Sequence, residues 1–239
     1  MTLDLLVGAA AVLAGAIASV AGFGIGSVLT PAFGLAVDTK VAVAAVAIPH
    51  FIGTAQRYWM LRAHVDRRML LGFGVTSALG GLAGALLHGV LSGRALSLVF
   101  GVLLLAAGTA ELTGWMRRVA WGRRTAWLAG ALSGGFGGLV GNQGSIRSAA
   151  MLGFDVPKEA FVATATAVAL FVDVARMPVY LATQGHELVP LLPSIGVATL
   201  GVVIGTALGA RLLGHLPQRM FRRTIALLLL ALGVYMLAF

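Results

Sequence analysis

Long, nearly continuous apolar runs constrain this chain more than any other feature of its sequence. The runs extend over about 20 residues, enough for an α-helix to cross a hydrocarbon core about 30 Å thick. Strands of a membrane barrel would instead be about 10 residues long and would alternate in polarity. Hydrophobic residues make up 59% of the sequence and charged residues 10%, which is more apolar than a soluble core requires. The sequence therefore predicts an all-α, polytopic membrane protein.

Charge and cysteine usage exclude several other classes. The net charge is +9, but Lys and Arg occur in short clusters between apolar runs, as in cytoplasmic loops and unlike a nucleic-acid-binding surface. The absence of cysteine excludes disulfides and thiolate sites. Residues 1–21 contain Asp4 but neither Lys nor Arg, so we expect them to stay in the mature protein and not to be a signal peptide.

The two halves of the chain resemble each other. Each contains a stretch that begins Leu-Ala-Gly-Ala, becomes glycine-rich and reaches Gly-Ser. The matching positions are 13–27 with 128–145, Arg57 with Arg176, and 79–85 with 200–206. We therefore predict two copies of one unit, 1–115 and 126–239, within a single integral membrane domain.

Each half contains a series of apolar segments. They lie near 5–20, 23–36, 39–61, 69–91 and 95–115 in the first half and near 126–140, 144–153, 157–182, 188–210 and 221–238 in the second. The second segment of each half is too short to cross alone, since at about 1.5 Å per residue it covers about half of the hydrocarbon core. We predict that it pairs with the first segment in a re-entrant helical hairpin, which three transmembrane helices follow. An odd number of crossings gives the second repeat an inverted topology.

The positions of Lys and Arg agree with this topology. It places one large basic group on a single face, namely Arg62, Arg67, Arg68, Arg117, Arg118, Arg123, Arg124, Lys158, Arg211, Arg219, Arg222 and Arg223. The opposite face receives only Lys40 and Arg94. Because basic loops face the cytoplasm, we expect the first face to be cytoplasmic and both termini to lie outside.

The glycine-rich break in each half predicts an anion site. A helix that begins inside the membrane leaves its first N–H groups unpaired and presents the positive end of its dipole. Glycines let the backbone approach a ligand, and polar side chains add donors. The candidate substrate-binding residues are Gly24, Gly26 and Ser27 in the first break and Asn142, Gln143, Gly144 and Ser145 in the second. The alternative is that the glycines only allow close helix packing.

Three arginines fall within the predicted membrane region, where an unpaired cation is costly. Arg147 follows the second break, and we predict that it binds the substrate; the alternatives are that it extends to the headgroups or pairs with Asp155. Arg57 and Arg176 occupy matching positions near the ends of their segments. Each is a candidate for substrate contact, with extension to the headgroup region as the alternative.

Two titratable residues are candidates for coupling to a proton. His50 follows Pro49 in the middle of its segment, and imidazole titrates near physiological pH. A structural histidine with a hydrogen-bond partner is the alternative. Asp173 stands three residues before Arg176 and hence on the same helix face, where it either neutralises that arginine or carries a proton.

Both breaks and one basic loop resemble a known family. The stretches "SVAGFGIGSVLTPAF" at 19–33, "SGGFGGLVGNQGSIRSAAML" at 133–152 and "LRAHVDRRML" at 61–70 are similar to the TauE/SafE family of sulfite and organosulfonate exporters, and the similarity covers essentially the whole chain. The resemblance implies a secondary transporter of the bacterial inner membrane that exports a small sulfur-containing anion such as sulfite, sulfoacetate or a related sulfonate. Relatives more often have Gly-Gly-Gly and then a proline in the second break, where this chain has Asn142-Gln143-Gly144 and Ala149.

The combined prediction is alternating access around an anion site formed by both breaks. Its partners are a small anion and the lipid bilayer, with a proton as coupling ion and a homodimer as open alternatives, and it needs no cofactor or metal. A passive anion or small-solute channel is the alternative function, because paired half-helices also build pores; the first break lacks a counterpart of Asn142, which argues against it. No zinc-protease, serine-hydrolase or dinucleotide motif occurs, so we do not expect an enzyme.

Overall fold

The computed structural model describes residues 2–114, 125–142, 144, 147, 151, 157–213 and 218–238, and this part of the chain is helical with no strand. The helices are α1 (Thr2–Ala21), α2 (Ile25–Gly34), α3 (Thr39–Leu61), α4 (Arg67–Met69), α5 (Val75–Val90), α6 (Gly93–Thr113), α7 (Ala126–Val140), α9 (Lys158–Leu188), α10 (Leu192–Leu213) and α11 (Gln218–Ala238). A 3-10 turn, η1 (Arg62–His64), precedes α4, and a π-helical turn, Leu70–Gly74, joins α4 to α5. The predicted segments 39–61 and 126–140 are confirmed to the residue.

Several helices have the length and composition of membrane spans. Four stretches qualify, at Asp4–Ala21, Arg67–Val90, Gly93–Thr113 and Glu159–Gly209, the last of which includes most of both α9 and α10. By contrast, α2 has 10 residues and α7 has 15, so each covers only part of a hydrocarbon core about 30 Å thick. The prediction of a multi-pass, all-α membrane protein is therefore confirmed.

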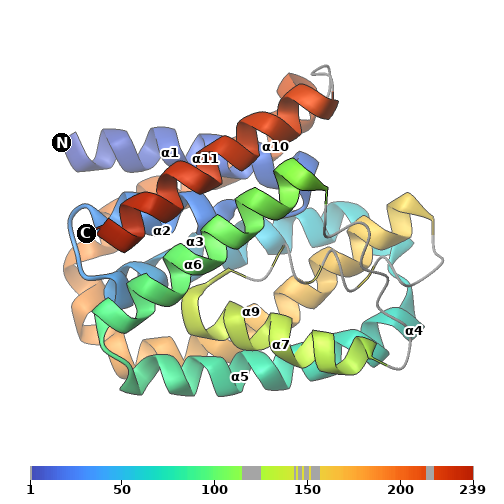
Figure 1. The fold of residues 1–239 in the computed structure, drawn as a ribbon, viewed down its shortest axis with the longest axis horizontal. Helices are drawn as coiled ribbons and strands as arrows, with labels where there is room; N and C mark the ends of the chain where they lie inside the picture. Colours follow the sequence, from blue (N-terminus) through green and yellow to red (C-terminus); the bar gives the residue numbers. More distant parts are fainter. Residues whose placement is uncertain are drawn as a thin grey trace.

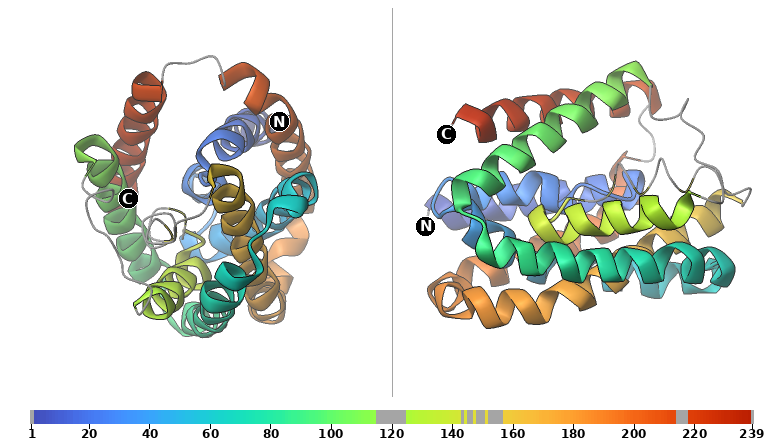
Figure 2. Two further views of the ribbon diagram at one scale, coloured as in Figure 1. Left: turned by 90° about the vertical axis from the view of Figure 1, so that its right-hand side faces the viewer. Right: turned by 60° about the horizontal axis from the view of Figure 1, so that its bottom comes forward.

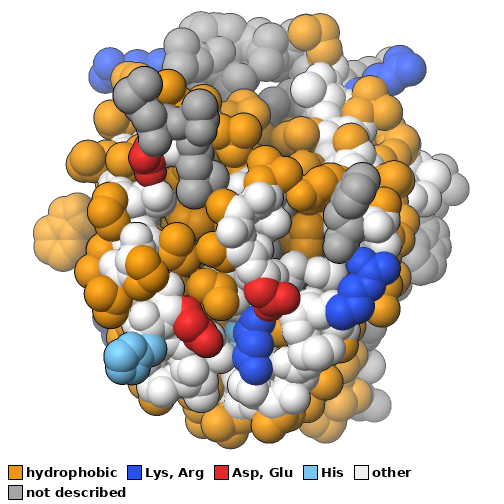
Figure 3. Space-filling view, turned by 90° about the vertical axis from the view of Figure 1, so that its left-hand side faces the viewer, with side chains coloured by type: hydrophobic (Ala, Val, Ile, Leu, Met, Phe, Trp, Pro, Cys, Tyr) orange, Lys and Arg blue, Asp and Glu red, His pale blue; other side chains and the backbone are white. Residues whose placement is uncertain are grey.

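The longer helices lie side by side, and both ends of the chain are at the same end of the bundle (Figures 1 and 2). We call this the terminal end. Polar contacts there join the ends of several helices: Ser194 donates to Asp4 at 2.6 Å, and Arg94 donates to the Leu237 carbonyl at 3.1 Å. Figure 3 shows this end, with charged side chains of both signs between hydrophobic ones.

The opposite end carries η1 and α4, and we call it the basic end (Figure 1). The ends of α3 and α10 and the start of α11 lie there. The exposed basic residues of these segments are Arg62, Arg67, Arg68, Arg211 and Arg223. The described residues of this end also include Asp66 and the exposed Glu159, so arginines outnumber acidic side chains there.

The most extensive helix contacts join the first half of the chain to the second. α1 packs along α10, and α5 packs along α7. Small residues allow both contacts, since a Cβ at Gly205 would lie 2.1 Å from the Val12 carbonyl oxygen and one at Gly134 would lie 1.9 Å from that of Ser77. These two pairs fix the positions of α1 and α7, the helices that lead into the glycine-rich breaks.

Two further helix pairs run antiparallel. α6 packs on α11, with Gly101 against Leu237 at one end of the contact and Gly108 against Leu230 further along. α3 packs on α9, and the contacts of His50 with Asp173 and of Asp66, just after α3, with Thr164 show that the two helices are antiparallel. This second pair brings together the polar side chains of the candidate site.

Candidate functional site

Each glycine-rich break begins where a helix ends inside the bundle. α1 ends at Ala21 and α7 at Val140, and each is followed by a glycine with left-handed backbone, Gly22 (φ 79°) and Gly141 (φ 73°). A side chain is disfavoured in that conformation, which explains the glycines. In both cases the glycine N–H donates to the carbonyl four residues earlier, at 3.0 Å.

The two breaks contact each other. A Cβ at Gly26, in the first turn of α2, would lie only 2.3 Å from the Gly141 carbonyl oxygen. A Cβ at Gly144 would lie 2.1 Å from the Cβ of Phe23. Glycine is therefore required at both positions for the breaks to meet.

An arginine caps the helix that ends at each break. Arg57 of α3 donates to the carbonyl of Ala18 at 2.5 Å, and Arg176 of α9 donates to that of Gly137 at 2.8 Å. These are the same carbonyls that accept the Gly22 and Gly141 N–H groups. Each of these carbonyls therefore accepts two hydrogen bonds, one from the backbone and one from a buried guanidinium, which ties α3 and α9 to the ends of α1 and α7. Arg57 and Arg176 are 6% and 1% exposed, so neither extends to the headgroup region.

The end of α7 has two further caps. Tyr180 donates its hydroxyl to the Gly138 carbonyl, and His88 Nδ1 lies 2.8 Å from the Leu139 carbonyl. Both side chains are 0% exposed, and their rings contact each other with centroids 4.8 Å apart. Side chains from α5 and α9 thus satisfy three consecutive carbonyls of the last turn of α7.

A small cavity lies where the breaks meet α3 and α9. Its wall is formed by Gly22, Phe23, Gly24, Gly26, Ser27, His50, Arg57, Gly141, Asn142, Gly144, Arg147 and Ala169. The space open to the centre of a water molecule is about 10 Å³, which is room for about one water. An oxyanion is larger than this space.

The start of α2 faces this cavity. Gly24, Gly26 and Ser27 are in its wall, and the first bond of the helix runs from the Val28 N–H to the Gly24 carbonyl at 3.1 Å. N–H groups before Val28 in α2 have no acceptor within the helix. They supply the partial positive charge of a helix N-terminus to the cavity.

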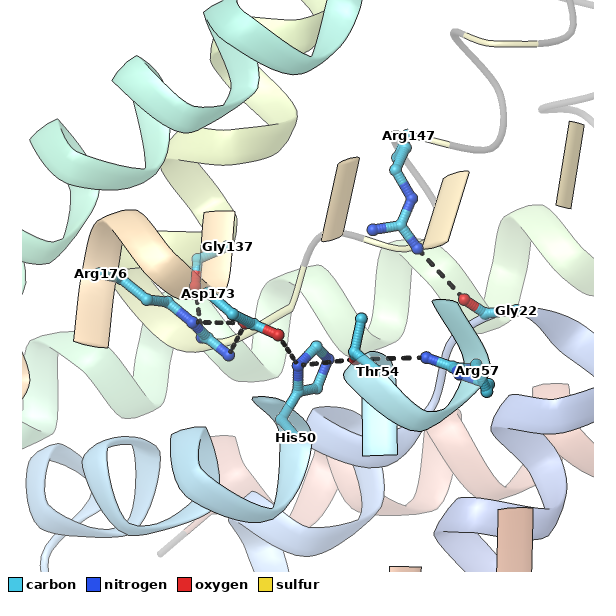
Figure 4. Close-up of polar contacts among 8 residues, drawn as sticks. All are labelled: Gly22, His50, Thr54, Arg57, Gly137, Arg147, Asp173 and Arg176. Carbon is cyan, nitrogen blue, oxygen red and sulfur yellow. Dashed lines mark hydrogen bonds and ion pairs between the residues drawn. The ribbon is translucent and has the colours of Figure 1, made fainter. Parts of the chain in front are cut away.

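Two buried arginines in the wall have no acidic partner among the residues that the structure describes. Arg147, 2% exposed, donates to the Gly22 carbonyl at 3.1 Å, whereas its Nε and Nη1 atoms have no hydrogen-bond partner (Figure 4). Arg57 donates to Ala18 and, at 3.4 Å, to Thr54, and its Nε has no partner. Buried, unpaired guanidinium groups are costly, so this cavity suits an anion.

A row of polar side chains leads away from Arg57. Thr54 Oγ1 lies 3.4 Å from His50 Nδ1, which lies 2.7 Å from Asp173 Oδ2. The other carboxylate oxygen of Asp173 accepts from Arg176 Nε at 3.0 Å and pairs with its Nη2 at 2.7 Å. Figure 4 shows the continuous row from Arg176 to Arg57. Asp173 therefore neutralises Arg176, as expected, and also binds His50.

Most of the predicted site residues converge on the cavity. Its wall includes Gly24, Gly26, Ser27, His50, Arg57, Asn142, Gly144 and Arg147. Asp173 and Arg176 are not in the wall, although they contact its neighbours. Gln143, Ser145 and Asp155 lie outside the described residues. The described residues include no group of acidic or histidine side chains that could hold a metal ion.

Sequence reasoning missed four residues that shape the site. Phe23 packs on Gly144, Thr54 contacts both Arg57 and His50, and Tyr180 and His88 cap α7. The available signal for Thr54 was its position three residues before Arg57, which matches that of Asp173 before Arg176. Tyr180 and His88 gave no comparable signal, because they act on backbone carbonyls.

A comparison with protein-family models decides the family. The model described as Sulfite exporter TauE/SafE matches residues 7–236, nearly the whole chain. The chain belongs to the TauE/SafE family. No curated protein and no solved structure matches it.

Membership makes this TauE/SafE chain a membrane transporter and connects it with sulfur-containing anions. It also agrees with the absence of enzyme motifs from the sequence. The family match and the unpaired arginines are independent observations, and both indicate an anionic substrate.

Proposed function

We propose that this TauE/SafE protein exports a small sulfur-containing anion, such as sulfite or a sulfonate, through the cavity between its two breaks. The observation that carries the proposal is the pair of buried arginines, Arg57 and Arg147, which both line the cavity and both have N–H groups without a hydrogen-bond partner. An anion would satisfy these donors and the free N–H groups of α2 together. Asn142 and Ser27 add polar groups to the same wall, and we assign Gln143 and Ser145 to the site from the sequence.

Alternating access is the mechanism that we propose. The cavity holds about one water, so the protein must open to one side to admit the anion and to the other to release it. The helix packing supports two inverted repeats, 1–115 and 126–239. α1 packs on α10 as its counterpart α7 packs on α5. The counterparts α3 and α9 pack antiparallel on each other, and so do α6 and α11. In this arrangement each half moves against the other around the site.

The proposed orientation places the basic end in the cytoplasm and the terminal end outside, in the bacterial inner membrane. The hairpin of α1 and α2 then enters from the outer face and returns to it. Export follows the membrane potential, because an inside-negative potential drives each negative charge outward with about 2.3 kcal/mol per 100 mV. We further propose a proton as coupling ion, carried by His50, which links the cavity wall to Asp173.

In this proposal Arg176 has a structural role and does not contact the anion. Its charge is neutralised by Asp173, its Nη1 caps α7, and its side chain stays behind the cavity wall. It is therefore a positioning residue that holds the second break in place, whereas Arg57 both caps α1 and contacts the anion.

Sulfite flux in proteoliposomes tests the proposal. Purified wild-type protein should transport sulfite in a saturable way, and Arg147→Ala should lower the rate at least about tenfold, because the anion loses a buried cation. Arg211→Ala is the matched control, since Arg211 is exposed at the basic end, and it should transport like wild type. Equal rates for Arg147→Ala and wild type would refute the site, and single-channel currents would indicate a passive pore.

A further inference from the structure

The two arginine caps differ in one neighbour, and this difference bears on substrate charge. In both halves an arginine binds the carbonyl that lies four residues before a left-handed glycine. Three residues before the arginine stands Asp173 in the second half and Thr54 in the first. Asp173 forms an ion pair with Arg176 at 2.7 Å, whereas the neutral Thr54 hydroxyl accepts from Arg57 at 3.4 Å.

We propose that Thr54 is a specificity-determining residue that makes the cavity select an anion with two negative charges. This inference rests on the proposed function and names the charge class of its substrate. By leaving Arg57 without a carboxylate, Thr54 keeps the charge of that guanidinium available to the ligand.

The charges around the cavity favour an anion with two negative charges. Arg57 and Arg147 are the cations in its wall, and Asp173 cancels Arg176 behind it. His50 is the remaining titratable group of the wall, and in its unprotonated state, before it takes up the coupling proton, it adds no charge. Over the described residues the site therefore has an excess of two positive charges, which a dianion neutralises and a monoanion does not.

A substitution at position 54 would change this excess of positive charge. Thr54 is 0% exposed and touches both Arg57 and His50. An aspartate there would reproduce the i, i+3 ion pair of Asp173 with Arg176, and it would cancel one of the two charges. An asparagine has nearly the same shape and cancels none.

Ligands that differ in charge but not in shape test the wild-type protein directly. Sulfate and methanesulfonate are both tetrahedral at sulfur and carry two charges and one charge, respectively. In detergent-solubilised wild-type protein, sulfate should displace bound radiolabelled sulfite at a concentration at least about tenfold lower than methanesulfonate. Equal displacement by the two, or displacement by methanesulfonate alone, overturns the proposal. A wild-type protein that binds no sulfite at all would instead refute the proposed function.

Variants then assign the selectivity to position 54. Thr54→Asp should lower the preference for sulfate over methanesulfonate at least about tenfold, whereas Thr54→Asn should keep it within about threefold. Because a carboxylate at 54 would also contact His50 and could hold it protonated, the same comparison is made in a His50→Gln background, where the side chain at 50 cannot take up a proton. A preference that is equal in the Asp and Asn variants of that background overturns the role of Thr54. If Thr54→Asp does not fold, the wild-type comparison still decides the charge class.

Discussion

Arg147 donates to the carbonyl of Gly22 at 3.1 Å, so a side chain from the second break is bonded to the backbone of the first. The contact crosses the cavity region and uses one of the three guanidinium nitrogens, while the other two stay unpaired. Such a bond holds the breaks together without consuming the donors that an anion needs. In the proposed mechanism Arg147 would therefore both hold the two breaks together and bind the anion.

Contact between the breaks should fail when a methyl group is added at Gly26. A Cβ there would lie 2.3 Å from the Gly141 carbonyl oxygen, and because this neighbour is backbone the breaks must move apart. We expect Gly26→Ala to destabilise the protein by about 1–3 kcal/mol and to abolish sulfite transport. Thermal unfolding in detergent and flux in proteoliposomes measure both effects.

Gly34→Ala is the control for this variant. Gly34 ends the same helix, and a Cβ at that position meets no atom within 4 Å. Unfolding temperature and transport should match wild type. If Gly26→Ala behaved like Gly34→Ala, the close approach of the two breaks would be wrong.

The hydrogen bonds that cap α7 predict that loss of the Tyr180 hydroxyl lowers the unfolding free energy. Tyr180→Phe removes the donor to the Gly138 carbonyl and leaves that buried group unpaired, so we expect a loss of about 1–3 kcal/mol in unfolding free energy. Tyr58→Phe, at a partly buried position of α3 whose hydroxyl has no hydrogen bond in the described structure, should change little. A Tyr180 variant as stable as the Tyr58 variant would argue against the cap.

Helix positions were the part of this fold that the sequence predicted well. The segments 39–61 and 126–140 match α3 and α7, because the length of an apolar run and its polar ends determine a membrane helix without reference to its neighbours. The predicted hairpin arm 5–20 is longer in the structure, where α1 covers Thr2–Ala21 and has the length of a full span. Its return through α2 therefore stays a prediction.

The site was predicted as a set of residues but not as a set of contacts. Isolated polar side chains in apolar runs are rare enough to identify Asn142 and Arg147, and the spacing Gly22, Gly24, Gly26 identified the first break. The neutralisation of Arg176 by Asp173 was predicted from their spacing, but contacts such as that of His50 with Asp173 join residues far apart in sequence. Tyr180 escaped notice because its partner is a carbonyl, and every residue has one.

Proton coupling predicts that His50 contributes to the pH dependence of transport. His50→Gln keeps an amide that can donate to Asp173, but it cannot titrate between pH 5 and 8. Sulfite itself gains a proton within this range, so we expect both proteins to share that pH dependence and the wild type to show a further change in flux that His50→Gln lacks. His64→Gln, at an exposed histidine in η1, is the control and should keep the wild-type profile. The same pH profile in His50→Gln and wild type would exclude His50 as the proton carrier.

The orientation can be tested by cysteine labelling, which is clean because the chain has no cysteine of its own. Ala36 follows α2 and Ser92 precedes α6, and both are exposed toward the terminal end, whereas Arg67 and Arg211 are exposed at the basic end. Single cysteines at 36 and 92 should react with a membrane-impermeant maleimide in spheroplasts, and those at 67 and 211 only after lysis. Labelling of position 36 only after lysis, with position 92 labelled in intact spheroplasts, would mean that α1 and α2 do not return to the terminal side. α1 and α2 would then not form a re-entrant hairpin, and the two breaks could no longer be half-helices that meet from opposite faces.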